Sequence, residues 1–492
     1  MPSSNGMRVT VIGAGASGLA AAKYLLAEGF VVTVFERKAN VGGVWNTAPG
    51  NGPYPAPVYE GLETNVARTL MTLSDHPWPK DASLFPRSEV VGAYLQSYAA
   101  AIQSTEFAAE NLTMRLYTNV LDVRRSSHLY TEYWRVTASK RTLGKDEAQT
   151  VEYFHGVVVA LGVYHEPHMP KQYNVDEWCQ AYPGSLIHAV DFCRPEHFRN
   201  KTVLVVGNSA SGWDISLQLK NVAKMVIVSS GRWKAGATLS APSHIGVKGI
   251  QSWDVSARSV TFTDGRTAYG VDNIILCTGY VYDFSFLRKG TQSLCGDEKL
   301  FETGLRVADV YKHIFYIHDP TLAFVGLPKK TAAFTVAEAQ SAVVARAFAG
   351  RILRPSKPAL ERWVREANET WKKDLADGKV GASDYHSFNL ALDKDYVNDL
   401  HDWSMRVIKS TMFEDDGQSP PYWCHCLDRA RKESGKMRRA FLEKKDRRHE
   451  YTTHQSLGGS LPASCDHGVT VTSQANKAGG HSRSCYLQTY AV

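Results

Sequence analysis

Two glycine-rich segments of the chain have the spacing of loops that bind the pyrophosphate of a dinucleotide. They are Gly13-Ala14-Gly15-Ala16-Ser17-Gly18 and Gly207-Asn208-Ser209-Ala210-Ser211-Gly212. Each follows a short strand-like run and precedes a segment of helical character. In this arrangement a phosphate binds the free N–H groups and the positive dipole end of the helix. Two such loops in one chain predict two dinucleotides bound at once, with hydride transfer between them as the chemistry.

The residues after the first loop complete a dinucleotide site. We expect a helix at Ser17–Leu26 and then a strand at 31–35, which ends at Glu36, 18 residues after Gly18. A carboxylate at this place accepts hydrogen bonds from ribose hydroxyls. The following pair Gly42-Gly43 lets the backbone pass close to a large cofactor. This extension resembles the FAD-binding glutathione-reductase-like group, so we expect FAD to contact Gly13, Gly15, Ala16, Ser17, Gly18, Glu36, Arg37, Gly43, Val44 and Trp45.

The second loop differs where the ribose acid should stand. The strand at 225–228 is followed by Ser229-Ser230-Gly231-Arg232-Trp233-Lys234, which contains no carboxylate. A hydroxyl and two cations suit a 2′-phosphate, and Arg232 can bind it with two hydrogen bonds. NADPH is therefore favoured over NADH, although solvated surface charges are the alternative for Arg232 and Lys234. The predicted contacts with NADPH are Gly207, Ser209, Ala210, Ser211, Gly212, Ser230 and Arg232.

Motifs between and beyond the loops point to one family. The segment from Tyr182 to Phe192, with Gly184 and His188, resembles the FxGxxxHxxx(Y/F) fingerprint of flavin-containing monooxygenases, with Tyr182 in place of the first Phe. Tyr59–Asn65 is similar to the family's Y-x-x-L-x-T-N stretch. Four further segments fall in family order between Met7 and Trp371: Leu84-Phe85-Pro86 through Tyr98, Cys277-Thr278-Gly279-Tyr280, Ala323–Pro328 and Glu338-Ala339-Gln340.

The resemblance implies an enzyme in which NADPH reduces FAD and the reduced flavin adds O2 to give a C4a-hydroperoxide. A soft nucleophile, sulfur or nitrogen of a small organic molecule, then takes up one oxygen atom. Asn65 matches the family asparagine that can hydrogen-bond the peroxide and the retained NADP⁺, which would make it catalytic. Thr64, Thr278, Gly279 and Gln340 match further cofactor contacts. The same likeness to soluble fungal and microbial members implies a role in fungal secondary metabolism.

Three alternatives stay open. A Baeyer–Villiger oxygenase begins from the same peroxyflavin but is disfavoured by Phe192-Cys193, because those relatives carry Trp-Pro or Trp-Asp at this end of the motif. A non-oxygenating NADPH-binding flavoprotein would also keep both loops. For His188, we favour a structural role in the linker between the cofactor domains, together with Gly184 and Phe192, over a role as an acid or base.

The resemblance implies an α/β fold with two Rossmann-like dinucleotide-binding domains, in which the NADPH domain is inserted into the FAD domain. We place the first part of the FAD domain at 1–165 and the NADPH domain at 166–290. The second part of the FAD domain, with a helical extension, is placed at 291–445. After that the composition turns to Ser, Thr, Gly and His, and we expect 446–492 to be a disordered tail.

The charge and composition of the chain indicate which classes of binding partner to expect. The net charge of +7 is concentrated between Arg429 and Arg448, where ten Lys/Arg meet three acids. A solvated helix is our first interpretation of that stretch, with docking on an anionic membrane or a partner as the second. We expect no nucleic acid partner, no transmembrane segment and a cytoplasmic location, while a homodimer is left open. Cys424-His425-Cys426 has no second half of a zinc site, so no metal is predicted.

Overall fold

Runs of β-branched residues form the central strands of two units in the computed structural model. The structure describes residues 6–47, 54, 56–128, 131–142, 145–164, 166–170, 175–231, 242–287, 304–388, 392–408 and 417–461. Unit 1 comprises Met1–Tyr54, Glu63–Val163 and Tyr282–Val492, and unit 2 comprises Pro55–Leu62 and Tyr164–Val281. The segment Pro55–Leu62 thus belongs to unit 2, although it falls within the domain predicted at 1–165.

Unit 1 is built on a seven-stranded sheet in the order β18-β19-β20-β7-β1-β2-β3. The five strands from β20 to β3 run parallel, whereas β19 is antiparallel to both of its neighbours. The strands are β1 Arg8–Ile12, β2 Val31–Phe35, β3 Leu112–Arg115, β7 Gly156–Val159, β18 Val310–Tyr311, β19 Phe315–Tyr316 and β20 Leu322–Phe324. β1 is central and buried along most of its length, which places the turn after Ile12 in the middle of the sheet edge.

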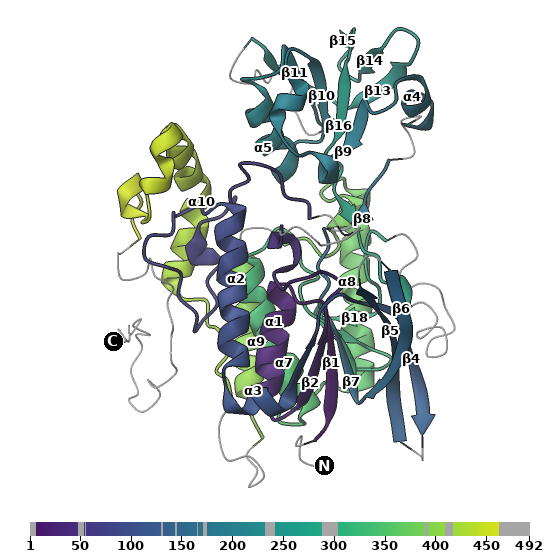
Figure 1. Cartoon of the computed structure of the whole chain (residues 1–492), viewed down its shortest axis with the longest axis vertical. Coiled ribbons are helices and arrows are strands. Elements are labelled where there is room, and N and C mark those ends of the chain that lie inside the picture. The colour runs from purple at the N-terminus through teal and green to yellow at the C-terminus, as the bar shows by residue number, and fades with distance from the viewer. Residues whose placement is uncertain are drawn as a thin grey trace. The chain divides into compact units, whose positions relative to one another are not determined.

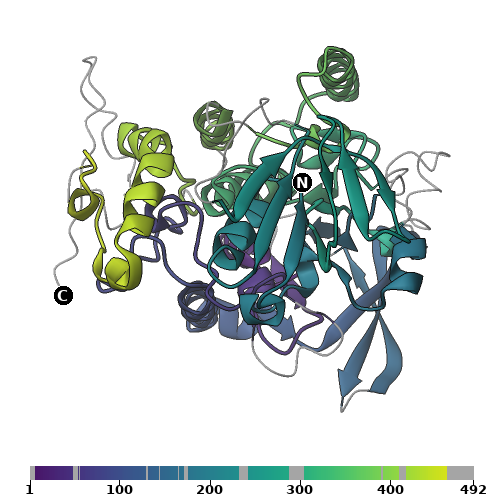
Figure 2. The ribbon, with the colours of Figure 1, turned by 90° about the horizontal axis from the view of Figure 1, so that it is seen from above.

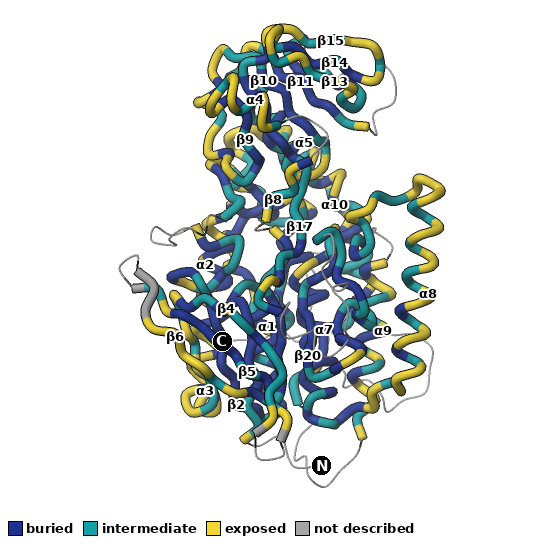
Figure 3. The backbone as a smooth tube through the Cα atoms, turned by 90° about the vertical axis from the view of Figure 1, so that its right-hand side faces the viewer, coloured by how far each residue is buried: buried dark blue, intermediate teal, exposed yellow. Residues whose placement is uncertain are grey.

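Two layers cover this sheet. Helices pack on one face and an antiparallel meander of β4, β5 and β6 lies on the other (Figure 1). α7 is buried nearly all round, whereas α8 turns much of its surface to solvent (Figure 3). The elements are α1 Ala16–Ala27, α2 Ser88–Gln103, α3 Glu106–Asn111, α7 Ala333–Phe348, α8 Lys357–Ala376, α9 Leu392–Met405, α10 His425–Glu443, β4 Thr118–His128, β5 Thr131–Thr142 and β6 Lys145–Phe154.

Unit 2 is also built around parallel strands, in a sheet that is smaller than that of unit 1. Its five-stranded sheet, β12-β11-β10-β16-β9, is parallel throughout. The elements are β8 Glu166–Pro167, α4 Val175–Ala181, β9 Leu186–His188, β10 Thr202–Val206, α5 Ala210–Leu219, β11 Met225–Ser229, β12 His244–Val247, β13 Ile250–Asp254, β14 Ser259–Phe262, β15 Thr267–Ala268, β16 Asn273–Leu276 and β17 Tyr280–Val281. Two sheets with parallel central strands, each with a strand–loop–helix start, confirm the predicted α/β class with two Rossmann-like domains.

The prediction of disorder from residue 446 is wrong for 446–461. Two 3-10 turns, Lys445–Glu450 and Gln455–Leu457, follow α10. Leu457 and Leu461 are buried, and the backbone N–H of Ser460 donates to Glu433 Oε2 at 3.1 Å. A polar segment needs only a few apolar anchors to fold when a preformed surface is there to receive them. Residues 462–492 lie outside the described part of the chain.

The basic stretch 429–448 is only partly a solvated helix. Most of it is α10, which lies beside the segment 63–87 in two perpendicular views (Figures 1 and 2). Met437 and Phe441 are fully buried and form one apolar cluster with Ala67, Leu84 and Phe85. The outer face carries exposed cations such as Lys432. The interpretation as a solvated helix therefore holds for one face, while the other face packs on unit 1.

We predict that Phe441→Ala lowers the free energy of unfolding by about 3–5 kcal/mol, because it leaves a cavity between α10 and unit 1. The matched control is Phe107→Ala, since Phe107 is 42% exposed whereas Phe441 is fully buried. The control should change stability by about 0.5 kcal/mol or less. Urea denaturation followed by circular dichroism measures both variants. Equal and small effects would contradict a docked α10.

Candidate functional site

Glycine is required at two positions of the first loop, because strand, loop and helix approach closely there. Gly13 follows β1 with φ of +103°, and a Cβ at this position would lie 2.7 Å from the carbonyl oxygen of Ala160. A Cβ on Gly18 would lie 1.8 Å from the carbonyl oxygen of Gly13. The N-terminus of α1 therefore lies close to the C-terminal end of β1, where its free N–H groups can face a pyrophosphate.

Glu36 joins the loop to the end of β2. Its side chain is buried, Oε2 accepts a hydrogen bond from the N–H of Ala14 at 2.8 Å, and Oε1 accepts one from the N–H of Lys38 at 2.8 Å. A carboxylate has about four acceptor sites, so two remain for the hydroxyls of a ribose. Neighbouring Arg37 lies with its guanidinium carbon 4.6 Å from the centre of the Tyr54 ring.

The pair Gly42-Gly43 closes over the first loop. The N–H of Gly42 donates to the carbonyl oxygen of Ala14 at 2.9 Å. A Cβ on Gly43 would lie 2.9 Å from Gly15 Cα, so two glycine backbones touch here. Val44 and Trp45 follow in a 3-10 turn, and the carbonyl oxygen of Trp45 lies so close to α2 that only glycine fits at residue 92. The predicted FAD residues around Gly13, Glu36 and Gly43 therefore converge.

Lys38 belongs to this cluster, although sequence reasoning passed over it. The side chain is buried, and Nζ donates to the carbonyl oxygen of Gly43 at 3.1 Å. Burial lowers the pKa of Lys38 to about 8. Nothing in the sequence distinguished it from a surface lysine, because the contact depends on how the Gly42-Gly43 turn folds back.

Thr64 offers a polar atom without a partner. It is 2% exposed, and its hydroxyl has no hydrogen-bond partner among the described residues, although its N–H donates to Pro86 at 3.0 Å. An unpaired buried hydroxyl is costly, and a bound cofactor would satisfy it. The next residue, Asn65, is exposed. Pro86 stands two residues before α2, which also contacts the Trp45 turn, so this segment and the glycine loop share one support.

Gln340 acts through a neighbouring loop. From α7 its Oε1 accepts the N–H of Gly326 at 2.8 Å, and its Nε2 donates to the hydroxyl of Tyr396 at 2.8 Å. Gly326 in turn lies against Ser17 of α1, where a Cβ would come within 2.3 Å of the serine oxygen. Gln340 thus holds the Gly326 loop against the helix that starts at the first glycine loop. Together, the closed loop, the free acceptor sites of Glu36 and the orphan hydroxyl of Thr64 fit FAD.

The second loop, in unit 2, has the same construction. Gly207 has φ of +107°, and a Cβ there would lie 2.4 Å from the carbonyl oxygen of Cys277, while a Cβ on Gly212 would lie 2.0 Å from that of Gly207. Ser209 replaces the middle glycine with φ of −93°, which any residue adopts. The side-chain oxygen of Asn208 is buried without a hydrogen-bond partner among the described residues. Ala210 and Ser211 open α5, so the loop fits a second dinucleotide.

The proposed 2′-phosphate site is described only in part. β11 ends at Ser229, whose hydroxyl donates to the carbonyl oxygen of Lys248 at 2.8 Å. The N–H of Ser230 donates to Val247 at 3.0 Å, which leaves the strand end next to β12. Arg232 lies outside the described residues. The part that is described contains no carboxylate between Met225 and Gly231.

His188 sits in the linker motif as a neutral hydrogen-bonded residue. Its Nδ1 accepts the N–H of Val190 at 3.2 Å, and its Nε2 lies 3.0 Å from the carbonyl oxygen of Gly279, which requires the Nε2–H tautomer. Burial lowers the pKa of His188 below its ordinary value. Both nitrogens are used within unit 2, in keeping with a structural role. Beside it, Thr278 donates its hydroxyl to the carbonyl oxygen of His168 at 2.6 Å.

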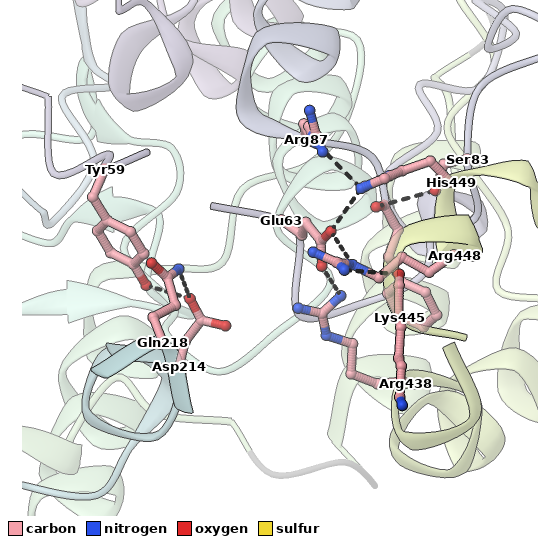
Figure 4. Close-up of polar contacts among 11 residues, drawn as sticks. Tyr59, Glu63, Ser83, Arg87, Asp214, Gln218, Arg438, Lys445, Arg448 and His449 are labelled. Carbon is pink, nitrogen blue, oxygen red and sulfur yellow. Dashed lines mark hydrogen bonds and ion pairs between the residues drawn. The ribbon is translucent and has the colours of Figure 1, made fainter. Parts of the chain in front are cut away.

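The rest of the motif packs the same unit. Gly184 has φ of +76° at the turn before β9. Phe192 is 1% exposed and stacks between Phe198 and the edge of Tyr59. The hydroxyl of Tyr59 donates to Asp214 Oδ2 of α5 at 2.8 Å (Figure 4). Sequence reasoning missed this Tyr59–Asp214 bond, because it joins residues 155 positions apart.

The described residues contain no group of three or more His, Cys, Asp or Glu side chains arranged to hold a metal ion. None of their helices has the length and apolarity needed to cross a membrane.

Known proteins resemble this chain over most of its length. Residues 6–241 and 242–409 match the family described as flavin-binding monooxygenase-like. Flavin-containing monooxygenase ustF2 of Aspergillus flavus is 29% identical over 469 residues, covering 80% of this chain and 91% of that protein. The thiol-specific monooxygenase of Saccharomyces cerevisiae is 31% identical over 351 residues, covering 69% and 77%. The structure of S-allyl-L-cysteine S-oxygenase from Allium sativum aligns with a TM-score of 0.73 at 26% identity, covering 92% and 97%.

A Gly→Ala substitution in each glycine loop tests separately which cofactor that loop binds. Gly18→Ala should abolish FAD binding, whereas Gly212→Ala should retain FAD but lose its reduction by NADPH, since each added Cβ meets a backbone oxygen at 2.0 Å or less. Gly435→Ala on α10 is the control, because its Cβ would find no atom closer than 3.9 Å. Flavin absorbance after purification and its bleaching by NADPH without oxygen are the measurements. FAD retained by Gly18→Ala would contradict the assignment.

Proposed function

The chain belongs to the flavin-binding monooxygenase-like family, and on that premise we propose that it uses NADPH and O2 to oxygenate a sulfur or nitrogen atom of a small organic molecule. FAD and NADPH are the cofactors typical of this family. The observation that carries the proposal is the pair of glycine loops in separate units. Only the first has a buried carboxylate, Glu36, at the end of its second strand.

Sulfur is our preferred target atom. Two of the relatives, a thiol-specific monooxygenase and an S-allyl-L-cysteine S-oxygenase, are named for sulfur compounds. A thiol or thioether sulfur is soft and nucleophilic, so it needs no activation by a protein base. This agrees with His188, which is neutral and fully bonded within unit 2.

The proposed roles of the side chains are to bind, orient and exclude water. When bound, FAD and NADPH supply the redox chemistry that activates O2. The N-termini of α1 and α5 would hold the two pyrophosphates, and Glu36 would orient the ribose of FAD. The hydroxyl of Thr64 would donate a hydrogen bond to the cofactor. The amide of Asn65, next to it and exposed, would orient the reacting oxygen and NADP⁺.

We also propose a cytoplasmic location. The eight cysteines are scattered along the sequence and do not form a regular framework, which suits a reducing compartment.

A mixed panel of a thioether, a tertiary amine and a cyclic ketone tests the proposed reaction. We expect a sulfoxide or N-oxide from the first two, with one NADPH consumed per product, because only soft nucleophiles react without activation. Mass spectrometry measures the product formed, and the absorbance of NADPH measures the NADPH consumed. Ester formation from the ketone without sulfoxide would instead indicate a Baeyer–Villiger enzyme. Oxidation of NADPH with hydrogen peroxide as the only product would contradict oxygenation altogether.

The role of Asn65 has its own test. Asn65→Ala should slow product formation about 10- to 100-fold, which corresponds to the loss of about 1.5–3 kcal/mol for a hydrogen bond to a charged group. Reduction of the flavin by NADPH without oxygen should not change. Asn65→Asp keeps the shape but removes the amide donor, so it should resemble Asn65→Ala. Unchanged ratios of product to NADPH in both variants would overturn the assignment.

A further inference from the structure

A buried carboxylate immediately before the Thr64-Asn65 pair is held by the C-terminal part of the chain. Glu63 has a side chain that is 3% exposed, Arg438 Nη1 of α10 lies 2.9 Å from its Oε2, and Arg448 Nε lies 2.7 Å from its Oε1 (Figure 4). We call Glu63, Arg438 and Arg448 the Glu63 clamp. Its two arginines lie beyond residue 409, where the match to the family ends.

His449 lies close to the clamp without being one of its ions. Its Nε2 is 3.0 Å from Glu63 Oε1 but accepts a hydrogen bond from Arg87 Nε at 3.2 Å. Burial, with Arg87, Arg448 and Arg438 nearby, lowers the pKa of His449 below its ordinary value. The negative charge of Glu63 is therefore balanced by the two arginines.

The clamp adds side-chain contacts to the backbone pairing of the segment 63–65. Glu63 forms an antiparallel bridge with Arg87, and Thr64 donates its N–H to Pro86. In addition, the carboxylate of Glu63 is held by cations from two different turns, one in α10 and one after it. Two charge-assisted hydrogen bonds from different directions define the position of a carboxylate closely.

Apolar contacts make α10 a rigid base for the clamp. Phe441 and Met437 pack with Leu84 and Phe85, which directly precede the two residues paired with Thr64 and Glu63. The guanidinium carbon of Arg438 lies 5.3 Å from the ring centre of Phe85 and 5.5 Å from that of Phe441, a cation–π arrangement. The two rings thus hold the Arg438 side chain in place in addition to its ion pair with Glu63.

The same helix holds a second loop of unit 1. Arg431 of α10 is 7% exposed, and its Nη2 donates to the carbonyl oxygen of Lys330 at 3.0 Å. It also forms an ion pair with Asp393 at 2.7 Å. Lys330 lies four residues after Gly326, the glycine that Gln340 holds against α1. α10 therefore contacts both segments that lead to predicted cofactor contacts.

We propose that α10 and the turn after it are a positioning element of the active site, in which Arg438 and Arg448 set the place of Asn65 through Glu63. The proposal rests on the role proposed for Asn65. Glu63, Arg438 and Arg448 are positioning residues, since none of them needs to touch the cofactor or substrate. Loss of any of these side chains displaces the amide of Asn65, while both dinucleotide loops stay intact.

The clamp is tested by the share of NADPH that ends as hydrogen peroxide instead of product. Arg438→Met removes the cation but keeps a long apolar side chain, and we expect it to raise this share about tenfold, as a small misplacement of a catalytic group does. Glu63→Gln should have the same effect, and the double variant should be no worse than either single one. The rate of flavin reduction by NADPH without oxygen should stay at the wild-type value.

Two controls separate positioning from folding. Arg439→Met alters an exposed arginine one residue away and should behave as the wild type, and Arg438→Lys should restore part of the coupling. If Arg438→Met does not fold, Arg448→Met carries the same expectation, since it acts on the other carboxylate oxygen. Wild-type coupling in the arginine variants, or loss of FAD in step with the loss of coupling, would overturn the proposal.

Asn65→Ala in the same assay distinguishes the two proposals. If Asn65→Ala uncouples the enzyme and the arginine variants do not, the clamp fails and the role of Asn65 stands. If Asn65→Ala stays coupled, the role of Asn65 fails and the clamp falls with it.

Discussion

The close approach of Gly18 to the backbone of Gly13 is the constraint on which unit 1 depends. Without side chains at these two positions, α1 can start directly at the edge of the sheet, which leaves the N–H groups of its first turn free. Glu36 then ties this turn to the end of the neighbouring strand. Unit 2 repeats the device with Gly207 and Gly212, packed against Cys277. The chain thus carries two helix starts of the kind that suits an anion, one on the sheet of each unit.

The chemistry follows from what surrounds these helix starts. The first has a buried acid, a buried lysine and an orphan threonine hydroxyl, whereas the described part of the second ends in serines without a carboxylate. These side chains can bind and orient cofactors, and the redox chemistry is left to the two cofactors. The protein contributes donors, acceptors and rigid supports. Gln340 illustrates this, since both ends of its amide hold other parts of unit 1.

Local patterns predicted the two loops and Glu36, because each depends on residues within one strand–loop–helix–strand segment, and the family resemblance predicted the α/β class. Contacts between distant segments could not be predicted in this way. Lys38 becomes buried only when the Gly42-Gly43 turn folds back, and Glu63 meets Arg438 across 375 positions of sequence. The polar composition after residue 446 suggested disorder, yet Leu457 and Leu461 anchor that segment on unit 1. The prediction for Arg232 lies outside the described residues.

In the reaction that we propose, one atom of O2 reaches sulfur and NADPH supplies the electrons. Turnover of a thioether under isotopically labelled O2 tests this, with mass spectrometry of the product and NADPH absorbance recorded together. We predict a sulfoxide that carries one labelled oxygen atom for each NADPH consumed. Unlabelled product, or consumption of NADPH that yields only labelled hydrogen peroxide, would contradict the proposed reaction.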